Sequence, residues 1–249
     1  MSGHSKWANI KYKKAVQDAK KGKVFTKIAR EITVAVKHGG DDPSANPRLR
    51  LALDKAKSVN MPKDNVDRAI KRGSGPSNDI NYEDVIYEGY GPGGVALLIS
   101  TLTDNKNRTV ADIRKILSKK GGSLGESGCV AWQFDRKGVI RIEKEAAAEE
   151  KVYDLAIEAE ALDITTQDDC YEIITEPQDL EKVKDIYIKN NIKIIRAEVT
   201  MLPKNYIPID KEEAKKLFNL ISELEELDDV QDVYSNFDVD ESVIEELRA

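Results

Sequence analysis

Residues 73–78 divide the chain into two parts that differ in the spacing of their apolar residues. The segment Gly73-Ser74-Gly75-Pro76-Ser77-Asn78 consists of residues typical of turns and linkers. Before it, apolar residues recur every three or four positions, as in amphipathic helices. After it, short apolar runs typical of strands begin. The sequence therefore predicts a helical N-terminal domain followed by a part that contains β-sheets.

The two parts also differ in charge. Residues 1–75 contain 18 lysines and arginines against 7 aspartates and glutamates, a formal charge of +11, whereas the remaining residues carry −17. The overall charge of −6 conceals this polarity. A lysine-rich surface that is merely solvated would explain a mixture of charges. It explains less well an excess of positive charge that is confined to one end of the chain. The polarity therefore favours a polyanionic partner for the N-terminal part.

Apolar spacing and cap residues predict the elements of each part. In the basic part we expect a helix around residues 25–38, a second that begins at Pro47 after an Asn46 cap, and a third that runs to Gly73. Beyond the linker, we expect strands at 82–88, 95–102 and 128–134 with a helix at 107–120. A second set comprises a strand at 139–143, a helix at 149–162, strands at 164–166 and 171–175, a helix at 178–189 and a strand at 193–200. A helix at 211–227 and a strand at 230–235 follow.

The order of these elements predicts a nested α+β fold. The second set has the βαββαβ order of a ferredoxin-like domain. The first set lacks a helix and a strand, which the last two elements would supply. We therefore expect a basic helical domain (1–78), a discontinuous two-layer α/β domain (79–135 plus 204–249), and an inserted ferredoxin-like α/β domain (136–203). Two separate α/β sandwiches, one after the other along the chain, fit the same order of elements almost as well.

The basic part contains the candidate nucleic-acid-binding residues. Cationic side chains neutralise phosphates, aromatic rings stack on unpaired bases, and residues such as Asn9 and Arg48 read base edges. The candidates are Lys6, Trp7, Asn9, Lys11, Tyr12, Lys13, Lys14, Lys20, Lys21, Lys23, Lys27, Arg30, Arg48 and Arg50. Burial in the core is an equally good interpretation of Trp7, and Lys27 and Arg30 are placed to rim the core. Charge and reach do not separate DNA from RNA.

No catalytic, metal or cofactor site is predicted. Residues 89–94 match the pattern G-x-G-x-x-G, but a predicted strand follows instead of a helix and Pro92 lacks an amide hydrogen, so we expect a hairpin turn. The acidic run at residues 225–229 is typical of a solvated helix end. Neither histidine lies near a nucleophile motif. Cys129 and Cys170 lack the spacing of a zinc site.

The sequence also limits the expected location and partners. No apolar run approaches the ~18–20 residues that cross a bilayer. The start of the chain has no apolar core of a signal peptide. We therefore expect a cytoplasmic protein whose partner is nucleic acid, with no membrane and no small-molecule substrate.

Several long motifs occur in order along nearly the whole chain, at residues 3–10, 23–27, 46–50, 60–65, 87–94, 102–109 and 128–132. Together they resemble the YebC/PmpR family of probable transcriptional regulators. The resemblance implies three domains, with the third inserted in the second. It also implies a non-enzymatic role. Tyr12 departs from the pattern, since many members have histidine there.

Two functions are consistent with the resemblance. The first is a DNA-binding transcriptional regulator that acts through the basic N-terminal helices. The second is a ribosome-associated, RNA-binding factor that assists elongation, as the related mitochondrial translational activators imply. The absence of an evident helix-turn-helix spacing weakens the first on physical grounds. An enzyme that uses a cleft between the α/β domains is a third class, but no titratable residues cluster in the sequence to support it.

Overall fold

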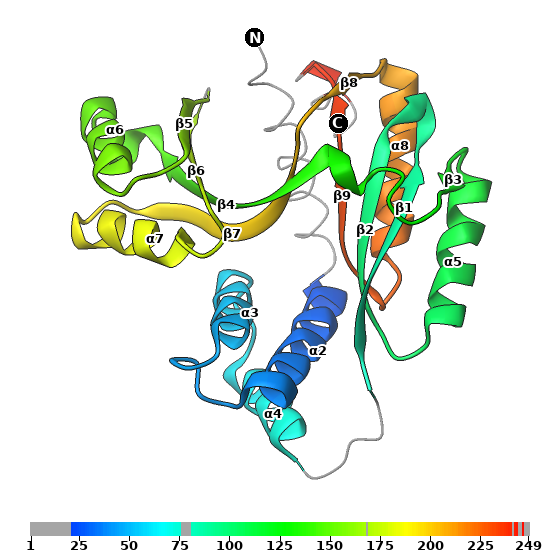
Figure 1. Cartoon of the computed structure of the whole chain (residues 1–249), viewed down its shortest axis with the longest axis horizontal. Helices are drawn as coiled ribbons and strands as arrows, with labels where there is room; N and C mark the ends of the chain where they lie inside the picture. The colour runs from blue at the N-terminus through cyan, green and yellow to red at the C-terminus, as the bar shows by residue number, and fades with distance from the viewer. Residues whose placement is uncertain (1–20, 76–80, 168, 241, 244–245, 247–249) are drawn as a thin grey trace.

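The computed structural model describes residues 21–75, 81–167, 169–240, 242–243 and 246. These residues form three bodies: a group of helices and two sheets, each of which is covered by helices (Figure 1). Among the described residues, none of the helices has the length and apolarity to span a lipid bilayer. The fold is α+β, as the order of elements predicts.

The helical domain consists of α2 (Lys21–Gly39), α3 (Pro47–Ser58) and α4 (Lys63–Ser74). As predicted, α3 begins at Pro47, and the Asn46 side chain accepts a hydrogen bond from the amide of Leu49 at 3.1 Å. The apolar faces of the three helices meet in one core around Ile32 and Leu49, both of which are fully buried. Because α2 contributes one face to this core, its opposite side remains available for other contacts.

The first sheet has the strand order β3-β1-β2-β9. Its elements are β1 (Glu83–Tyr90), β2 (Ala96–Thr103), α5 (Lys106–Lys119), β3 (Ser123–Leu124), α8 (Lys211–Glu225) and β9 (Val230–Ser235). Strands β1 and β2 form the predicted antiparallel hairpin across residues 91–95. Successive residues of β2 face opposite sides of the sheet. Leu97 and Ile99 pack against α5 and α8, whereas Leu98 packs against Val130 and Phe134.

The second sheet has the strand order β5-β6-β4-β7, with every neighbour antiparallel. Its elements are β4 (Phe134–Glu143), α6 (Glu149–Glu158), β5 (Asp163–Thr166), β6 (Cys170–Thr175), α7 (Leu180–Lys189) and β7 (Ile194–Pro203). Residues such as Ile140 and Ile173 form a core with α6 and α7. This is the ferredoxin-like arrangement that the βαββαβ order predicts.

The second sheet is inserted between elements of the first. The chain leaves the first sheet before β4 and returns after β7, and these two strands pair antiparallel from Phe134 opposite Pro203 to Ile142 opposite Ile194. Strand β9 then pairs with β2. A short parallel pair, β8 (Ile207–Pro208) and β10 (Phe237–Asp238), closes the same end. The residue numbers at which one domain gives way to the next stay a prediction.

The expected strand at residues 128–134 is wrong. Strand β4 begins only at Phe134 and belongs to the inserted sheet, and the third strand of the first sheet is the two-residue β3. Residues before Phe134 form a loop and a short 3-10 helix (Ala131–Gln133), with Gly128 at a φ of 87°. The reason is a buried carboxylate: Glu88 accepts hydrogen bonds from the amides of Gly128, Val130 and Ala131. These amides are therefore not available for a sheet.

Candidate nucleic-acid interface

Most of the predicted nucleic-acid-binding residues lie outside the described residues. These are Lys6, Trp7, Asn9, Lys11, Tyr12, Lys13, Lys14 and Lys20. Lys21 is the first residue of α2, and its side chain is not described. The structure therefore places the side chains of five candidates: Lys23, Lys27 and Arg30 on α2, and Arg48 and Arg50 on α3.

Three cationic side chains of α2 form a stripe on the side of the helix away from its own core. Lys23, Lys27 and Arg30 follow one another at spacings of four and three residues, so they lie on one face. We call Lys23, Lys27 and Arg30 the α2 stripe. It points toward the end of α8 and the turn that leads into β9, both of which belong to the second domain.

The α2 stripe contacts the carboxyl end of α8. The ammonium of Lys23 donates to the carbonyl of Glu226 at 3.0 Å and to its carboxylate at 2.5 Å. Lys27 donates to the carbonyl of Glu225 at 2.7 Å. Carbonyls in the last turn of a helix have no partner within the helix, and cations stabilise that end. The α2 stripe therefore supplies cationic partners to α8, whose last turn contains no basic residue.

Arg30 completes this contact. Its Nη1 donates to the carbonyls of Leu102 and Asp228, both at 3.0 Å, and to the Asp229 carboxylate at 2.7 Å. Its guanidinium also lies 4.8 Å from the centroid of the Tyr82 ring. The charged, polar and aromatic partners all come from the chain beyond the linker. Arg30 is therefore the most extensively held residue of the α2 stripe.

Asp229 lies at the centre of a charged network. Arg108 on α5 donates to its Oδ2 at 2.6 Å, and the Thr109 hydroxyl lies 2.7 Å from the same oxygen. Burial alone would raise the pKa of Asp229, but hydrogen bonds from Arg108, Thr109 and Arg30 outweigh it and hold the pKa below the ordinary aspartate value. The carboxylate is therefore ionised at neutral pH and fixes α2, α5 and the start of β9 together.

Lys27 experiences the opposite balance. Burial in the contact lowers its pKa from the ordinary lysine value, and the nearby carboxylates of Glu225 and Asp232 only partly offset that effect. The acidic run at 225–229 is thus not simply solvated, as the sequence suggested. It accepts hydrogen bonds from cationic side chains of another domain.

The two candidate arginines of α3 are also engaged. Arg48 forms a bidentate pair with the carboxylate of Asp84 in β1, at 2.8 and 2.9 Å. The Asp84 side chain is 60% exposed, so this pair is accessible to solvent and weak. Arg50 donates to the carbonyl of Pro43 in the preceding loop. The structure does not bring the five described candidates to one open surface.

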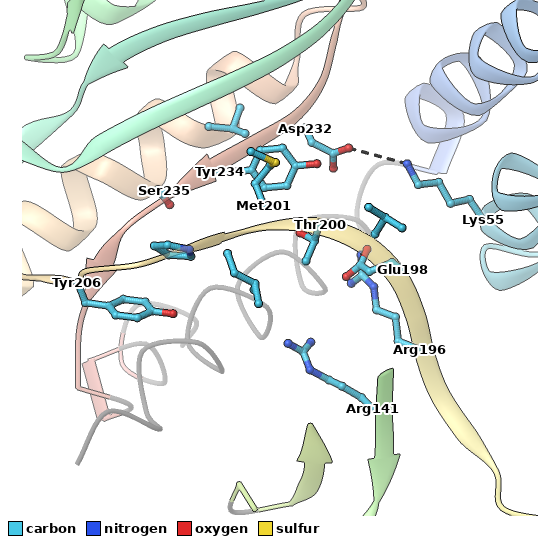
Figure 2. Close-up of a pocket in the computed structure, with 14 residues that line it drawn as sticks. Lys55, Arg141, Arg196, Glu198, Thr200, Met201, Tyr206, Asp232, Tyr234 and Ser235 are labelled. Atoms are coloured by element: carbon cyan, nitrogen blue, oxygen red, sulfur yellow. Dashed lines mark hydrogen bonds and ion pairs between the residues drawn. The ribbon is translucent and has the colours of Figure 1, made fainter. Parts of the chain in front are cut away.

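A pocket lies where the three domains meet (Figure 2). Lys55 of α3 forms ion pairs with Glu31 at 3.3 Å and with Asp232 of β9 at 3.9 Å. On β7, near Lys55, Arg196 pairs with Glu198 at 2.7 Å (Figure 2). Arg141 forms a buried pair with Glu172 at 2.6 Å. Because these cations face carboxylates, the pocket is a charged junction between domains, not an open anion site.

Five basic residues outside the predicted set are exposed on α4 and at the end of α3. They are Lys57, Lys63, Arg68, Lys71 and Arg72. The α4 residues among them are exposed, whereas Ala69 of the same helix is buried and faces α2. The sequence signal was present, because the apolar positions of α4 fix which face is exposed. Asp64 and Asp67 lie among these cations, so the charge of the exposed face of α4 is mixed.

Comparisons with known proteins bear on this arrangement. Residues 5–76 match the model described as the TACO1/YebC protein N-terminal domain, and residues 82–237 match that of the TACO1/YebC second and third domain. The chain belongs to the TACO1/YebC family. The boundary between the two matched regions falls at the Gly/Pro linker.

Two relatives and one solved structure show how far the likeness to the TACO1/YebC family extends. A protein of Dictyoglomus turgidum named "Probable transcriptional regulatory protein" is 52% identical over 99% of this chain and its own full length. A protein of the same name from Natranaerobius thermophilus is 53% identical over 98% of this chain and 99% of its own. The crystal structure of a conserved hypothetical protein from Aquifex aeolicus is 45% identical, with a TM-score of 0.79 over 90% of this chain and 93% of that one.

Proposed function

We propose that this protein is a non-enzymatic, nucleic-acid-binding regulator of gene expression, a DNA-binding transcriptional regulator that acts through its basic N-terminal helices. The observation that carries the proposal is the separation of charge between residues 1–75, at +11, and the acidic remainder, at −17. Phosphate neutralisation supplies most of the affinity of a protein for nucleic acid, and the acidic domains would repel a second broad contact. The names of the relatives point the same way.

One observation favours a second candidate, an RNA-binding translation factor that associates with the ribosome. The exposed face of α4 carries Asp64 and Asp67 among its cations. A recognition helix in a DNA groove lies between two walls of phosphate, which such carboxylates oppose. Contact with ribosomal RNA from one side tolerates mixed charge better, because RNA is recognised largely by its shape and its unpaired bases.

A charge-reversal variant tests the shared part of both candidates. Lys11→Glu, Lys13→Glu and Lys14→Glu together should abolish retention on DNA and RNA and flatten the dependence of binding on salt. The matched control reverses three exposed cations of α5 instead, through Arg114→Glu, Lys115→Glu and Lys119→Glu. Both variants change the net charge equally. Equal binding by the two, with both folded by circular dichroism, contradicts the proposal.

Crosslinking in cells separates the two candidates. Ultraviolet crosslinking followed by sequencing of the attached nucleic acid identifies the polymer directly. Enrichment of promoter DNA supports the transcriptional regulator. Enrichment of ribosomal RNA over promoter DNA overturns it in favour of the translation factor.

A further inference from the structure

The carboxyl end of α8 resembles a short polyanion. It presents the backbone carbonyls of Glu225, Glu226 and Asp228 and the carboxylates of Glu226 and Asp229 to α2. The negative end of the helix dipole adds to these charges, since no basic residue lies in the last turn of α8. We call residues 225–229 the acidic end. Its oxygens are hydrogen-bond acceptors, as the oxygens of a phosphate backbone are.

The α2 stripe uses its donors on the acidic end in the way that phosphate contacts require. Lys23 and Lys27 each direct an ammonium at oxygen atoms, at distances between 2.5 and 3.0 Å. Arg30 directs one guanidinium nitrogen at two of them, the Asp228 carbonyl and the Asp229 carboxylate, and also at the carbonyl of Leu102 in β2. The acidic end also covers these donors, and the Arg30 side chain is only 15% exposed, so a phosphate can reach Arg30 only if the acidic end moves away. Nucleic acid and the acidic end are therefore alternatives for the α2 stripe.

The side chains that form the contact become less exposed along the α2 stripe, from Lys23 to Arg30. The side chain of Lys23 is 47% exposed and that of Glu226 is 36% exposed, whereas those of Arg30 and Asp229 are 15% and 11% exposed. Exposed ion pairs contribute little to stability, so a phosphate can replace Glu226 at small cost. Lys27 is partly buried where it donates to the Glu225 carbonyl, and this loss of hydration lowers its pKa. The amino end of the stripe, next to the strongly basic residues 1–20, is therefore the end that opens most easily.

We propose that Lys23, Lys27 and Arg30 form a phosphate-binding stripe that the acidic end of α8 occupies in the free protein, so that the two compete. This inference rests on the proposed function, and it adds a regulatory step. Nucleic acid bound by residues 1–20 draws phosphates toward Lys23, displaces the acidic end, and separates α2 from the second domain.

Neutralising the acidic end tests the competition. Glu226→Gln removes the exposed carboxylate at Lys23 and leaves the backbone carbonyl in place. The matched control is Glu212→Gln, which makes the same charge change at an exposed position in the first turn of the same helix. We expect full-length Glu226→Gln to bind a fluorescein-labelled 20-nucleotide RNA and a 20-base-pair DNA about threefold or more tightly than Glu212→Gln. Its plot of log affinity against log salt should be steeper by about one.

A second measurement reports on displacement without any variant. Hydrogen exchange of the amides at residues 226–230 should become faster when the same labelled RNA or DNA saturates the wild-type protein. Slower or unchanged exchange in this segment overturns the competition, as does equal affinity of Glu226→Gln and Glu212→Gln.

The failure of this inference can be told apart from the failure of the proposed function. If the wild-type protein binds the probes but Glu226→Gln matches its control, only the competition is wrong. If neither the wild-type protein nor Glu226→Gln binds either probe, the proposed function and the competition both fall. Lys23→Gln in the Glu226→Gln background supplies a further check, because it should return the affinity to that of Glu212→Gln or below.

Discussion

Arg30 of α2 lies 2.7 Å from Asp229, 199 positions later in the chain. The other oxygen of the same carboxylate accepts a hydrogen bond from Arg108 of α5 at 2.6 Å. One aspartate thus serves two arginines from two domains, and the hydroxyls of Thr103 and Thr109 complete its shell. This carboxylate therefore links the helical domain to the first sheet.

Replacing this carboxylate should destabilise the whole protein. Asp229→Asn leaves the largely buried Arg30 without its anion and removes one of the two carboxylates that pair with the exposed Arg108. Breaking a mostly buried pair costs about 2–4 kcal/mol. The free energy of unfolding from urea titration measures this loss. Asp104→Asn is the control, because Asp104 pairs with the same Arg108 but is more exposed, and it should cost less than about 1 kcal/mol. Equal losses in both variants would contradict the role given to Asp229.

The stability that Asp229 contributes should disappear in acid. The pKa of Asp229 is lower in the folded protein than in the unfolded chain, where it is about 4. The ionised carboxylate therefore contributes its full stabilisation above the unfolded pKa. This stabilisation is lost as pH falls through the folded pKa. The difference in unfolding free energy between the wild-type protein and Asp229→Asn should be constant from pH 6 to pH 8. It should shrink steadily below about pH 4. A difference that stays constant down to pH 2.5 would show that the carboxylate is not the source.

The buried carboxylate of Glu88 should control the loop that carries Trp132. Three backbone amides donate to Glu88 at 2.6–2.7 Å, and these hydrogen bonds outweigh burial and lower its pKa. Glu88→Gln should reduce stability by about 1.5–3 kcal/mol, as expected for the loss of hydrogen bonds to a charged group. Trp132 fluorescence in a Trp7→Phe background reports on the loop. Glu126→Gln, an exposed position in the same loop, should change neither quantity.

Replacing either of two helical glycines with alanine should change the stability of the protein in opposite directions. A Cβ at Gly73 would lie 2.6 Å from the carbonyl oxygen of Thr33 and 2.7 Å from the Cβ of Val36, so Gly73→Ala forces α4 away from α2. Such overpacking costs about 1–3 kcal/mol. A Cβ at Gly22 would meet nothing within 4 Å, and Gly22→Ala should be neutral or stabilising by up to about 1 kcal/mol. Thermal denaturation of the two variants compares the sites directly.

Neither cysteine should react readily in the folded protein. Burial, followed by the charge of Asp169, raises the pKa of Cys170 to about 11, so only about one thiol in a thousand is ionised at pH 8. Burial and the neighbouring Glu88 also raise the pKa of Cys129. Labelling with iodoacetamide at pH 8, read by peptide mass spectrometry, should be at least tenfold slower in buffer than in 8 M urea for both. Rapid native labelling of Cys170 would contradict its burial.

Sequence reasoning predicted the fold because local patterns fix most of it. The Asn46-Pro47 cap, the hairpin at residues 91–95 and strand β9 over Val230–Ser235 each depend on residues close together in the chain. The error at residues 128–134 arose because Glu88, 40 positions away, holds the amides of that loop. A periodic pattern contains no information about so distant a partner.

The same limit applies to the candidate site. The composition shows that residues 1–75 are basic. It does not indicate that Lys23, Lys27 and Arg30 contact residues about 200 positions later in the chain. The acidic run at 225–229 and the α2 stripe were each visible, yet which charges meet is decided by tertiary packing. The pairing of Arg48 with Asp84 across the linker was hidden for the same reason.

The inserted domain, which runs from β4 to β7, also determines when the first sheet can be completed during synthesis. Leu98 of β2 pairs with Tyr234 of β9, and 136 positions separate them. At 5–20 residues per second, β2 waits on the order of ten seconds on the ribosome for its second neighbour. During that time its hydrogen-bonding edge is bare, and unpaired edges recruit other chains. A nascent chain released before residue 230 would carry a finished third domain beside an unfinished sheet, so premature termination near the 3′ end should yield aggregates and not a shortened soluble protein.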